Sequence, residues 1–572
     1  MLSFKEFKNQ IKMIIENIMK RKIYCIWFLT LGFIINSCDK SLEEELVTDV
    51  SAASYYTTEK GFQDAVNATY SLLKPFYGQE IGFTMTVFGT DTYNNGADGS
   101  HKFFNFYDTS LNASSSMVRD AWATWYRGVN QANGVINRSA GIEMDEAEKT
   151  SRIAEVRFLR ALYYFNIVTT YGDAHLSLEE TEGIEVEANK TPQAEIYNQA
   201  IIPDLEFAIA TLPNSQSDYG RATKAAAEFL LGKVLLTRSY KSFADGSDAS
   251  RAETLFSNVI NNYGFSLLDD FADLWDINNQ ENSEMVFVVP NSKSQVDSGI
   301  DSYGHRGHLY FLQEYDVRRG MTRDIENGRP WKRFRPTNFT LSLWDRDIDT
   351  RYDKSFKHVW YANKNEPATP ANPENGEPAR AALAIGDTAI FIPGPGKDID
   401  WPQSRQDTKP YITITNDEYS ERLFPSMNKW IDPTRPDRQK EQGQRDFILM
   451  RLADAYLLRA EARLQQNNPS GAAIDINVVR VRSAVPGQEA AIEITSSDVD
   501  IDFILDERAR ELIGEGWRWW DLTRTGKLVE RTRLHNPTAA PNIQDYHVLR
   551  PIPQEQIDRT LGGYPQNPGY PQ

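Results

Sequence analysis

Cysteine and histidine are scarce in this chain of 572 residues, which contains two cysteines and seven histidines. Cys25 and Cys38 both lie near the N-terminus, so no disulfide can form within the chain that follows Cys38, and packing must stabilise that part. The histidines include no HExxH motif, and the pair His305 and His308 has no nearby cysteine or helical context. We therefore expect neither a metal site nor a cofactor.

Basic residues are too few to balance the acidic ones. There are 62 Lys and Arg against 80 Asp and Glu, which gives a formal net charge of −18 at pH 7. A surface of that sign repels nucleic acid and anionic lipid headgroups. We expect no nucleic-acid partner.

The apolar run Ile23–Ile35 is too short to cross a bilayer, since a spanning helix needs about 20 residues. It follows the compact basic segment Met19–Lys22, and this order is typical of a secretory signal peptide. We predict that residues 1–37 are the signal peptide. The residues before Met19 look like an upstream extension, so the start at Met1 or Met19 stays open.

The residues just before Cys38 resemble the lipobox of bacterial lipoproteins, in which the cysteine sulfur is lipidated and the peptide is cut before it. The alternative is an ordinary signal peptide with an incidental cysteine. We predict lipidation of Cys38 and a lipidated acidic tether over residues 38–55. The tether sequence "DKSLEEELVTDV" resembles the acidic signal that sends lipoproteins of Bacteroidetes-type bacteria to the cell surface, and a plain solvated linker is the alternative.

Helical periodicity dominates both ends of the remaining chain, which exceeds the roughly 250 to 300 residues at which one core stops growing. A buried helix is predicted over Glu155–Asp173, ending at Gly172, and another over Ala222–Arg238, where small residues such as Gly232 let a second helix approach closely. Phe447–Ala484 reads as two helices, broken at residues 467–469 and restarted from Ser470 as N-cap.

These helix-turn-helix pairs are the unit of tetratricopeptide-like solenoids, although no clean thirty-four-residue repeat is present. We predict a mostly α fold: a tetratricopeptide-like helical-repeat scaffold with a loop-rich, partly β ligand-binding region. Short strand-like runs such as Glu284–Val289 lie in the loop-rich part. The predicted organisation is an N-terminal helical region over 56–268 and a C-terminal region over 269–572, with a loop-rich insert (269–443) and a helical part (444–572).

Several segments resemble successive signatures of the SusD/RagB family of outer-membrane nutrient-binding lipoproteins. They are "VRFLRALYYFNIVTTYGDAHL", "RATKAAAEFLLGKVLL", "LMRLADAYLLRAEA", "ILDERARELIGEGWRWWDLTRTGKL" and "LRPIPQEQIDRTLGGYPQNPGY". The resemblance implies a helical scaffold of four tetratricopeptide-like units and a less regular binding region. It also implies an outer-membrane lipoprotein that partners a SusC-like TonB-dependent transporter and captures glycans, or in some members peptides, without chemistry.

The acidic segment "DERARELIGEG" is the place where a catalytic pair of carboxylates is conceivable. Glu507, Glu511 and Glu515 follow one another at i, i+4 spacing and alternate with Arg508 and Arg510, a pattern that favours a structural ion-pair network. We therefore expect no enzyme activity. The rivals to glycan capture are a peptide-capturing RagB-like lipoprotein, a surface-anchored glycoside hydrolase, and a scaffold that binds nothing.

Aromatic and amide side chains together are what a sugar-binding surface needs, because pyranose faces stack on rings and hydroxyls need polar partners. Two loop regions, Phe88–Tyr107 and Ser302–Phe311, mix both kinds. The predicted ligand-binding residues are Asp91, Tyr93, Asn94, Asn95, Tyr303, His305 and Tyr310. For any single aromatic, packing is the alternative, and Trp122, Trp125, Tyr126 and the "WRWWDL" motif are assigned to the core.

One stretch is strongly basic within this acidic protein. Arg318–Thr337, "RRGMTRDIENGRPWKRFRPT", carries six arginines and a lysine. This stretch could bind an acidic glycan, but we favour a structural role in which it pairs with acidic residues elsewhere in the protein.

Overall fold

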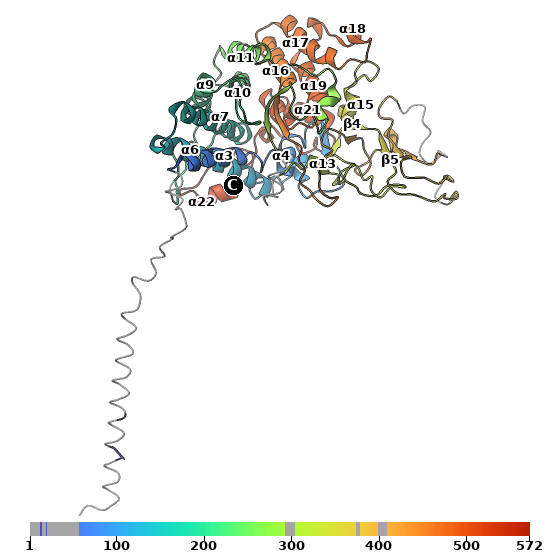
Figure 1. The fold of residues 1–572 in the computed structure, drawn as a ribbon, viewed down its shortest axis with the longest axis horizontal. Helices are drawn as coiled ribbons and strands as arrows, with labels where there is room; N and C mark the ends of the chain where they lie inside the picture. Colours follow the sequence, from blue (N-terminus) through green and yellow to red (C-terminus); the bar gives the residue numbers. More distant parts are fainter. Residues whose placement is uncertain are drawn as a thin grey trace, which may run out of the picture. The chain divides into compact units, whose positions relative to one another are not determined.

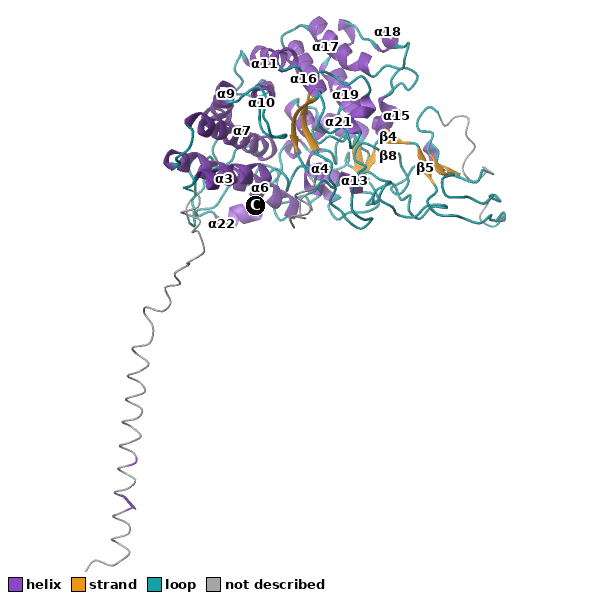
Figure 2. Ribbon diagram, viewed as in Figure 1, coloured by secondary structure: helices purple, strands orange, loops and turns teal. Residues whose placement is uncertain are grey.

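Helices are the commonest regular element of the computed structural model (Figures 1 and 2). The structure describes residues 57–571, apart from 182, 292–303, 373, 375–377 and 398–408, together with residues 12, 13 and 19. The predicted lipidation site Cys38, the tether and Tyr303 lie outside the described residues. No helix among the described residues is both long and apolar enough to cross a membrane.

Helix α7 (Glu146–Tyr171) shows why these segments are helical. The Asp145 side chain accepts a hydrogen bond from the Glu148 backbone N–H and caps the start, so the helix begins earlier than predicted. The chain leaves the helix at Gly172, whose φ of +79° suits glycine, and this predicted end is confirmed. Apolar side chains are buried on several faces, as expected for a helix with neighbours all round.

Successive helices pack against one another and form an arch over the upper left of Figure 1. In order of contact they are α6 (Ser116–Arg138), α7, α9 (Ile202–Thr211), α10 (Lys224–Arg238), α11 (Asp248–Asn262), α16 (Leu452–Gln465) and α17 (Pro469–Arg482). Close approach needs glycine: a Cβ at Gly232 would lie 2.9 Å from the Phe256 ring, and one at Gly128 would lie 2.5 Å from the Tyr163 ring. The predicted mostly helical, tetratricopeptide-like scaffold is confirmed.

Twelve further α-helices complete the helical part of the described residues. They are α3 (Glu59–Ser71), α4 (Glu80–Thr86), α5 (Phe103–Phe106), α8 (Gln193–Ile196), α13 (Gly307–Tyr310), α14 (Asn338–Ser342), α15 (Arg351–Ser355), α18 (Glu489–Ile492), α19 (Ile501–Glu511), α20 (Arg518–Arg524), α21 (Leu528–His535) and α22 (Gln554–Arg559).

The segment from Phe447 differs from its prediction in two ways. Residues Phe447–Arg451 form strand β9, not helix, and pair antiparallel with β2 (Met285–Val289). The partner strand is distant in the sequence, so periodicity within the segment could not reveal the pairing. The second helix is capped by Asn468, whose side chain accepts from the Gly471 N–H with Pro469 in the first turn, and not by Ser470.

The remaining strands are short and lie in the loop-rich part, on the right of Figure 2. They are β1 (Tyr93–Asn95) with β3 (Phe334–Pro336), β4 (Phe356–Lys357) with β8 (Ser426–Met427), and the sheet of β5 (Val359–Tyr361), β6 (Thr388–Phe391) and β7 (Ile412–Thr413). The three-stranded sheet covers a small core of its own. Residues from Thr57 onward form one compact unit, and the predicted boundary at residue 268 stays a prediction.

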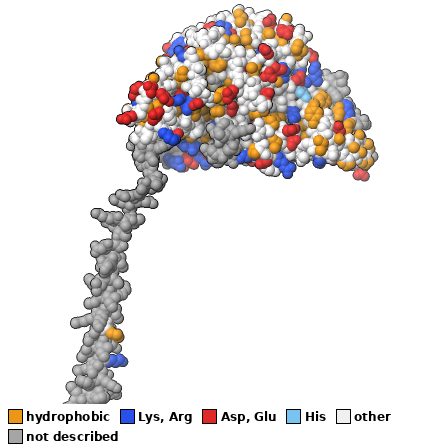
Figure 3. All heavy atoms as spheres, in the orientation of Figure 1, with side chains coloured by type: hydrophobic (Ala, Val, Ile, Leu, Met, Phe, Trp, Pro, Cys, Tyr) orange, Lys and Arg blue, Asp and Glu red, His pale blue; other side chains and the backbone are white. Residues whose placement is uncertain are grey.

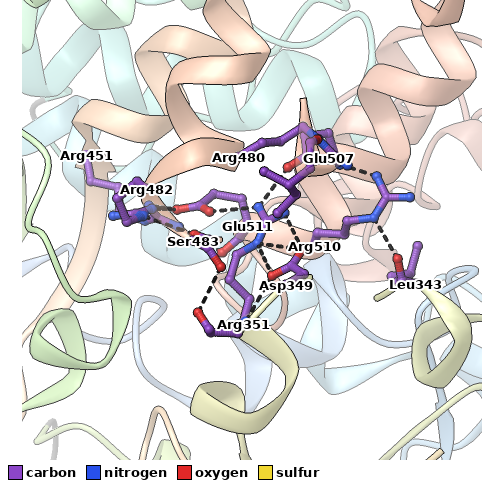
Figure 4. Close-up of polar contacts among 12 residues, drawn as sticks. Leu343, Asp349, Arg351, Arg451, Arg480, Arg482, Ser483, Glu507, Arg510 and Glu511 are labelled. Atoms are coloured by element: carbon purple, nitrogen blue, oxygen red, sulfur yellow. Dashed lines mark hydrogen bonds and ion pairs between the residues drawn. The ribbon is translucent and has the colours of Figure 1, made fainter. Parts of the chain in front are cut away.

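A buried ion-pair network joins α19 to its neighbours (Figure 4). The Glu507 carboxylate lies 2.7 Å from guanidinium nitrogens of both Arg351 and Arg480, and Glu511 accepts from Arg351 and from Arg451 at 3.0 and 2.7 Å. Arg351 and Arg451 are at most 1% exposed. The predicted structural ion-pair network is confirmed.

The network fixes the protonation state of its carboxyl groups. Burial alone would raise the pKa of Glu507, but the nearby guanidinium groups, that of Arg351 foremost, lower it to about 2. Since this pKa is depressed, the stabilisation is fully present above the unfolded value of about 4.3 and is lost as the pH falls toward 2. A carboxyl group of this kind is a poor general acid near neutral pH.

Replacing Arg451 with Met should lower the free energy of unfolding by about 3 kcal/mol or more, because Glu284, Glu511 and Glu515 would each lose a buried cationic partner. Urea unfolding followed by circular dichroism measures the change. The matched control is Arg251→Met, which removes an exposed pair with Glu206 and should cost less than about 1 kcal/mol. Equal losses in the two variants would contradict the structural role of the network.

Candidate functional site

The two loop regions predicted to bind ligand meet in the structure, and a third segment lies between them. The backbone N–H groups of Trp331 and Arg333 donate to the carbonyls of Leu309 and Tyr310 at 2.8 and 2.9 Å. On the other side, the N–H of Gly96 donates to the Arg333 carbonyl at 2.9 Å. The middle of the basic stretch therefore joins the two loops.

The predicted residues of the first loop are buried. Asp91 is 0% exposed, and its carboxylate accepts from Arg518 Nε at 2.7 Å and from Arg531 Nε at 2.8 Å. Burial alone would raise the pKa of Asp91, but these two guanidinium groups, with Arg518 the stronger, lower it below its ordinary value. The Tyr93 ring is 1% exposed and packs edge-on against Phe311, with ring centroids 5.3 Å apart.

The two asparagines hold the loop in place. Asn94 Oδ1 accepts from Arg335 Nε at 3.0 Å, and Asn95 Nδ2 donates to Glu421 Oε1 at 2.8 Å. Asn95 Oδ1 also accepts from Asn105 at 3.1 Å. Both amides are almost fully buried, so their hydrogen-bonding groups serve the protein itself.

The described residues of the second loop are buried as well. The His305 ring is 1% exposed and packs 5.0 Å from the Trp430 ring, and burial lowers its pKa to about 3. Tyr310 is 0% exposed and lies beneath the edge of Trp331, with ring centroids 6.0 Å apart. Among the described residues no cluster of potential ligands could hold a metal ion.

Burial of this degree leaves no ring face or amide for a sugar to contact. We therefore do not carry the six described candidates forward as ligand contacts, and their contact with a ligand stays an untested prediction. They hold the loops that carry a different, more exposed group of side chains.

That group is the Trp331 platform, which we define as Trp331 with the three arginines around its ring. The guanidinium carbons of Arg306, Arg329 and Arg333 lie 5.1, 5.4 and 4.9 Å from the ring centroid. Trp331 is only partly buried. The platform thus combines a partly exposed aromatic ring with guanidinium donors that lie over it.

Carboxylates hold the arginines in place. Glu441 pairs with both Arg306 and Arg329, at 3.0 Å in the latter case, and Glu80 at the start of α4 lies 2.9 Å from Arg333. The sequence left the basic stretch open to an acidic glycan but favoured a structural role for it. That role is confirmed by these pairs, yet the tryptophan between the basic residues was the signal for a second one.

A concave surface with a volume of about 720 Å³ lies between α6 and α22. Two of its aromatic side chains are Trp122, 5% exposed, and Tyr126, whose rings are tilted with centroids 4.7 Å apart. The Trp122 indole donates to Gln556 at 3.2 Å, and the Tyr126 hydroxyl donates to the His175 carbonyl at 2.9 Å. With their polar groups engaged, these rings suit stacking less well than Trp331 does.

Replacing Tyr93 with Ala should destabilise the fold by about 3 kcal/mol or more, because it removes a buried ring from a packed aromatic cluster. Tyr93→Phe is the matched control and should change the free energy of unfolding by less than about 1 kcal/mol, since the ring contacts remain. Thermal and urea unfolding measure both. A stable Tyr93→Ala protein with weakened ligand binding would restore Tyr93 as a contact residue.

Comparison with known protein families gives two matches. Residues 275–570 match the model described as the SusD family, and residues 48–236 match the model described as starch-binding associating with outer membrane. Among curated proteins, a SusD-like protein of Formosa agariphila is 27% identical over 94% of this chain and 99% of its own. The starch-binding protein SusD of Bacteroides thetaiotaomicron is 25% identical over 81% of this chain and 80% of its own.

Solved structures show the same fold. A SusD homologue from Bacteroides thetaiotaomicron superposes with a TM-score of 0.71 at 22% identity, covering 91% of this chain and 99% of that one. A laminarin-binding SusD-like protein gives a TM-score of 0.67 at 24% identity, with 90% and 100% covered. Because the SusD family model alone matches more than half of the residues, the chain belongs to the SusD family.

Proposed function

We propose that this chain is a cell-surface lipoprotein that captures glycans on the Trp331 platform and delivers them to a SusC-like TonB-dependent transporter in the outer membrane. Family membership supports glycan capture, since one relative is named for starch binding and one structural neighbour for laminarin binding. The observation that carries the proposal here is a partly exposed tryptophan with the guanidinium groups of three arginines over its ring.

Capture proceeds without bond cleavage in this proposal. A glycoside hydrolase needs two carboxyl groups flanking the scissile bond, one of them able to deliver a proton. Glu507 and Glu511, the pair that the sequence offered, are 0% exposed and bound to arginines. Release of reducing ends from a bound polysaccharide by the purified protein would favour the hydrolase instead.

Binding to a flat platform is modest in affinity, because few contacts must offset the freedom that a flexible oligosaccharide loses. Longer oligosaccharides should bind better, since more sugar rings reach the surface around Trp331. The family resemblance implies delivery to a transporter, and the helical arch offers an extended face on which the transporter could dock.

Replacing Trp331 with Ala should weaken glycan binding by about 1 kcal/mol, a change of roughly fivefold in Kd, because the stacking surface is lost. A glycan array on the mature chain with Cys38→Ser identifies a ligand, and calorimetry on the variants then measures affinity. Tyr361→Ala removes an aromatic ring that is 61% exposed elsewhere and is the matched control.

Unchanged glycan affinity in Trp331→Ala would remove the platform from the proposal. A parent protein that binds peptide libraries and no glycan would support the peptide-capturing alternative.

Replacing Cys38 with Ser should release the protein from the membrane fraction, because the thiol that carries the lipid is gone. Cys25→Ser is the control and should leave the protein anchored, since Cys25 is removed with the predicted signal peptide. Fractionation in cells without the transporter measures the anchor alone. Persistent membrane attachment of Cys38→Ser there would contradict lipidation, and attachment only when the transporter is present would support the partnership.

A further inference from the structure

We propose that the glycan captured by the Trp331 platform is anionic and carries carboxylate or sulfate groups. The proposal rests on the proposed function, because it names the chemical class of the ligand at that same site. It is carried by the charges around the platform, which do not balance.

Cationic side chains outnumber their carboxylate partners in the described residues of this surface. The three arginines of the platform, Arg306, Arg329 and Arg333, pair with two carboxylates, Glu441 and Glu80. Sharing explains the difference, because Glu441 pairs with both Arg306 and Arg329. A surplus of one positive charge remains.

This local surplus is opposite in sign to the whole protein. The chain carries a formal net charge of −18, and on the face drawn in Figure 3 acidic side chains gather on the left while several basic ones lie along the lower edge. An acidic protein as a whole repels anionic ligands. A positive surface at the binding platform offsets that repulsion at the one place where an anionic chain has to dock.

The arginines also retain donors that face solvent. Arg306 uses Nη2 for Glu441, while Arg329 uses Nη1 for Glu441 at 3.0 Å and for the Gln439 carbonyl at 3.2 Å. No hydrogen bond joins the other Nη atom of Arg306 or of Arg329 to a described residue. Guanidinium forks of this kind match carboxylate and sulfate oxygens in geometry and charge.

The two halves of the platform together specify one ligand class. The Trp331 ring offers a face for the apolar side of a sugar, and the two arginines beside it offer charge-assisted hydrogen bonds to an acidic substituent on the same ring or its neighbour. A neutral sugar would use the ring and leave the surplus charge unmatched.

The test compares ligands that differ only in charge. Oligogalacturonate is measured against the same oligomer fully methyl-esterified, and a sulfated galactan oligosaccharide against its unsulfated counterpart, by calorimetry on the mature chain with Cys38→Ser. We expect at least one anionic probe to bind tenfold tighter than its neutral partner, with affinity falling as NaCl is raised from 50 to 500 mM.

Arg329→Gln should reduce this anionic preference to threefold or less, and Arg329→Lys, which keeps the charge but loses the fork, should retain part of it. Arg251→Gln, at an exposed ion pair outside the platform, is the matched control and should leave the preference unchanged. Because the readout is a ratio of two affinities on one protein, partial unfolding of a variant lowers both values and leaves the ratio intact.

Equal binding of charged and neutral partners, or an unchanged ratio in Arg329→Gln, would overturn the anionic preference. If only neutral glycans bind, and Trp331→Ala abolishes their binding, the anionic preference is overturned but the proposed function stands. If no glycan binds, charged or neutral, both are overturned.

Discussion

The rest of the structure depends on the buried pairing between the carboxylates at the end of α19 and the arginines that surround them. Charges in an apolar interior are costly unless each meets an opposite charge in good geometry, so the pairs select one arrangement of the elements that carry them. Glu511 alone contacts arginines from the α15 segment, from β9 and from the end of α17. The scaffold and the loop-rich part are thereby fixed to each other (Figure 4).

The same kind of contact reaches outward to the platform. Asp91 is held by Arg518 and Arg531, which fixes the first loop to α20 and α21. Lys429 pairs with Glu515 at 2.8 Å, and the adjacent Trp430 packs on His305 of the second loop. The segment that carries Trp331 is hydrogen-bonded to both of these loops. Although the segment is irregular, these contacts hold the Trp331 ring in one orientation.

The loop residues chosen from the sequence show what amino-acid composition can and cannot predict about a binding site. Polar and aromatic side chains in a loop indicate ligand contact, but a region with few regular backbone hydrogen bonds also needs them to satisfy its own buried groups. Asn95, for example, lies in a buried chain of amides with Asn105 and Asn536. The structure shows these candidate side chains to be buried, which the sequence could not reveal, because a sequence does not show which way a loop side chain points.

Local features by themselves determined most of the predicted helices, the end of α7 at Gly172 and the ion-pair network of α19. The sequence reveals a glycine at the end of an apolar helix, and glutamates at i, i+4 spacing among arginines, because both patterns involve residues within one or two helical turns. Pairings between distant segments were decided only by the tertiary structure. Strand β9 forms because β2 lies beside it. Tyr93, His305 and Tyr310 are buried while Trp331 stays partly exposed. The burial of a side chain depends on the packing of the whole molecule, so no single stretch of sequence reveals it.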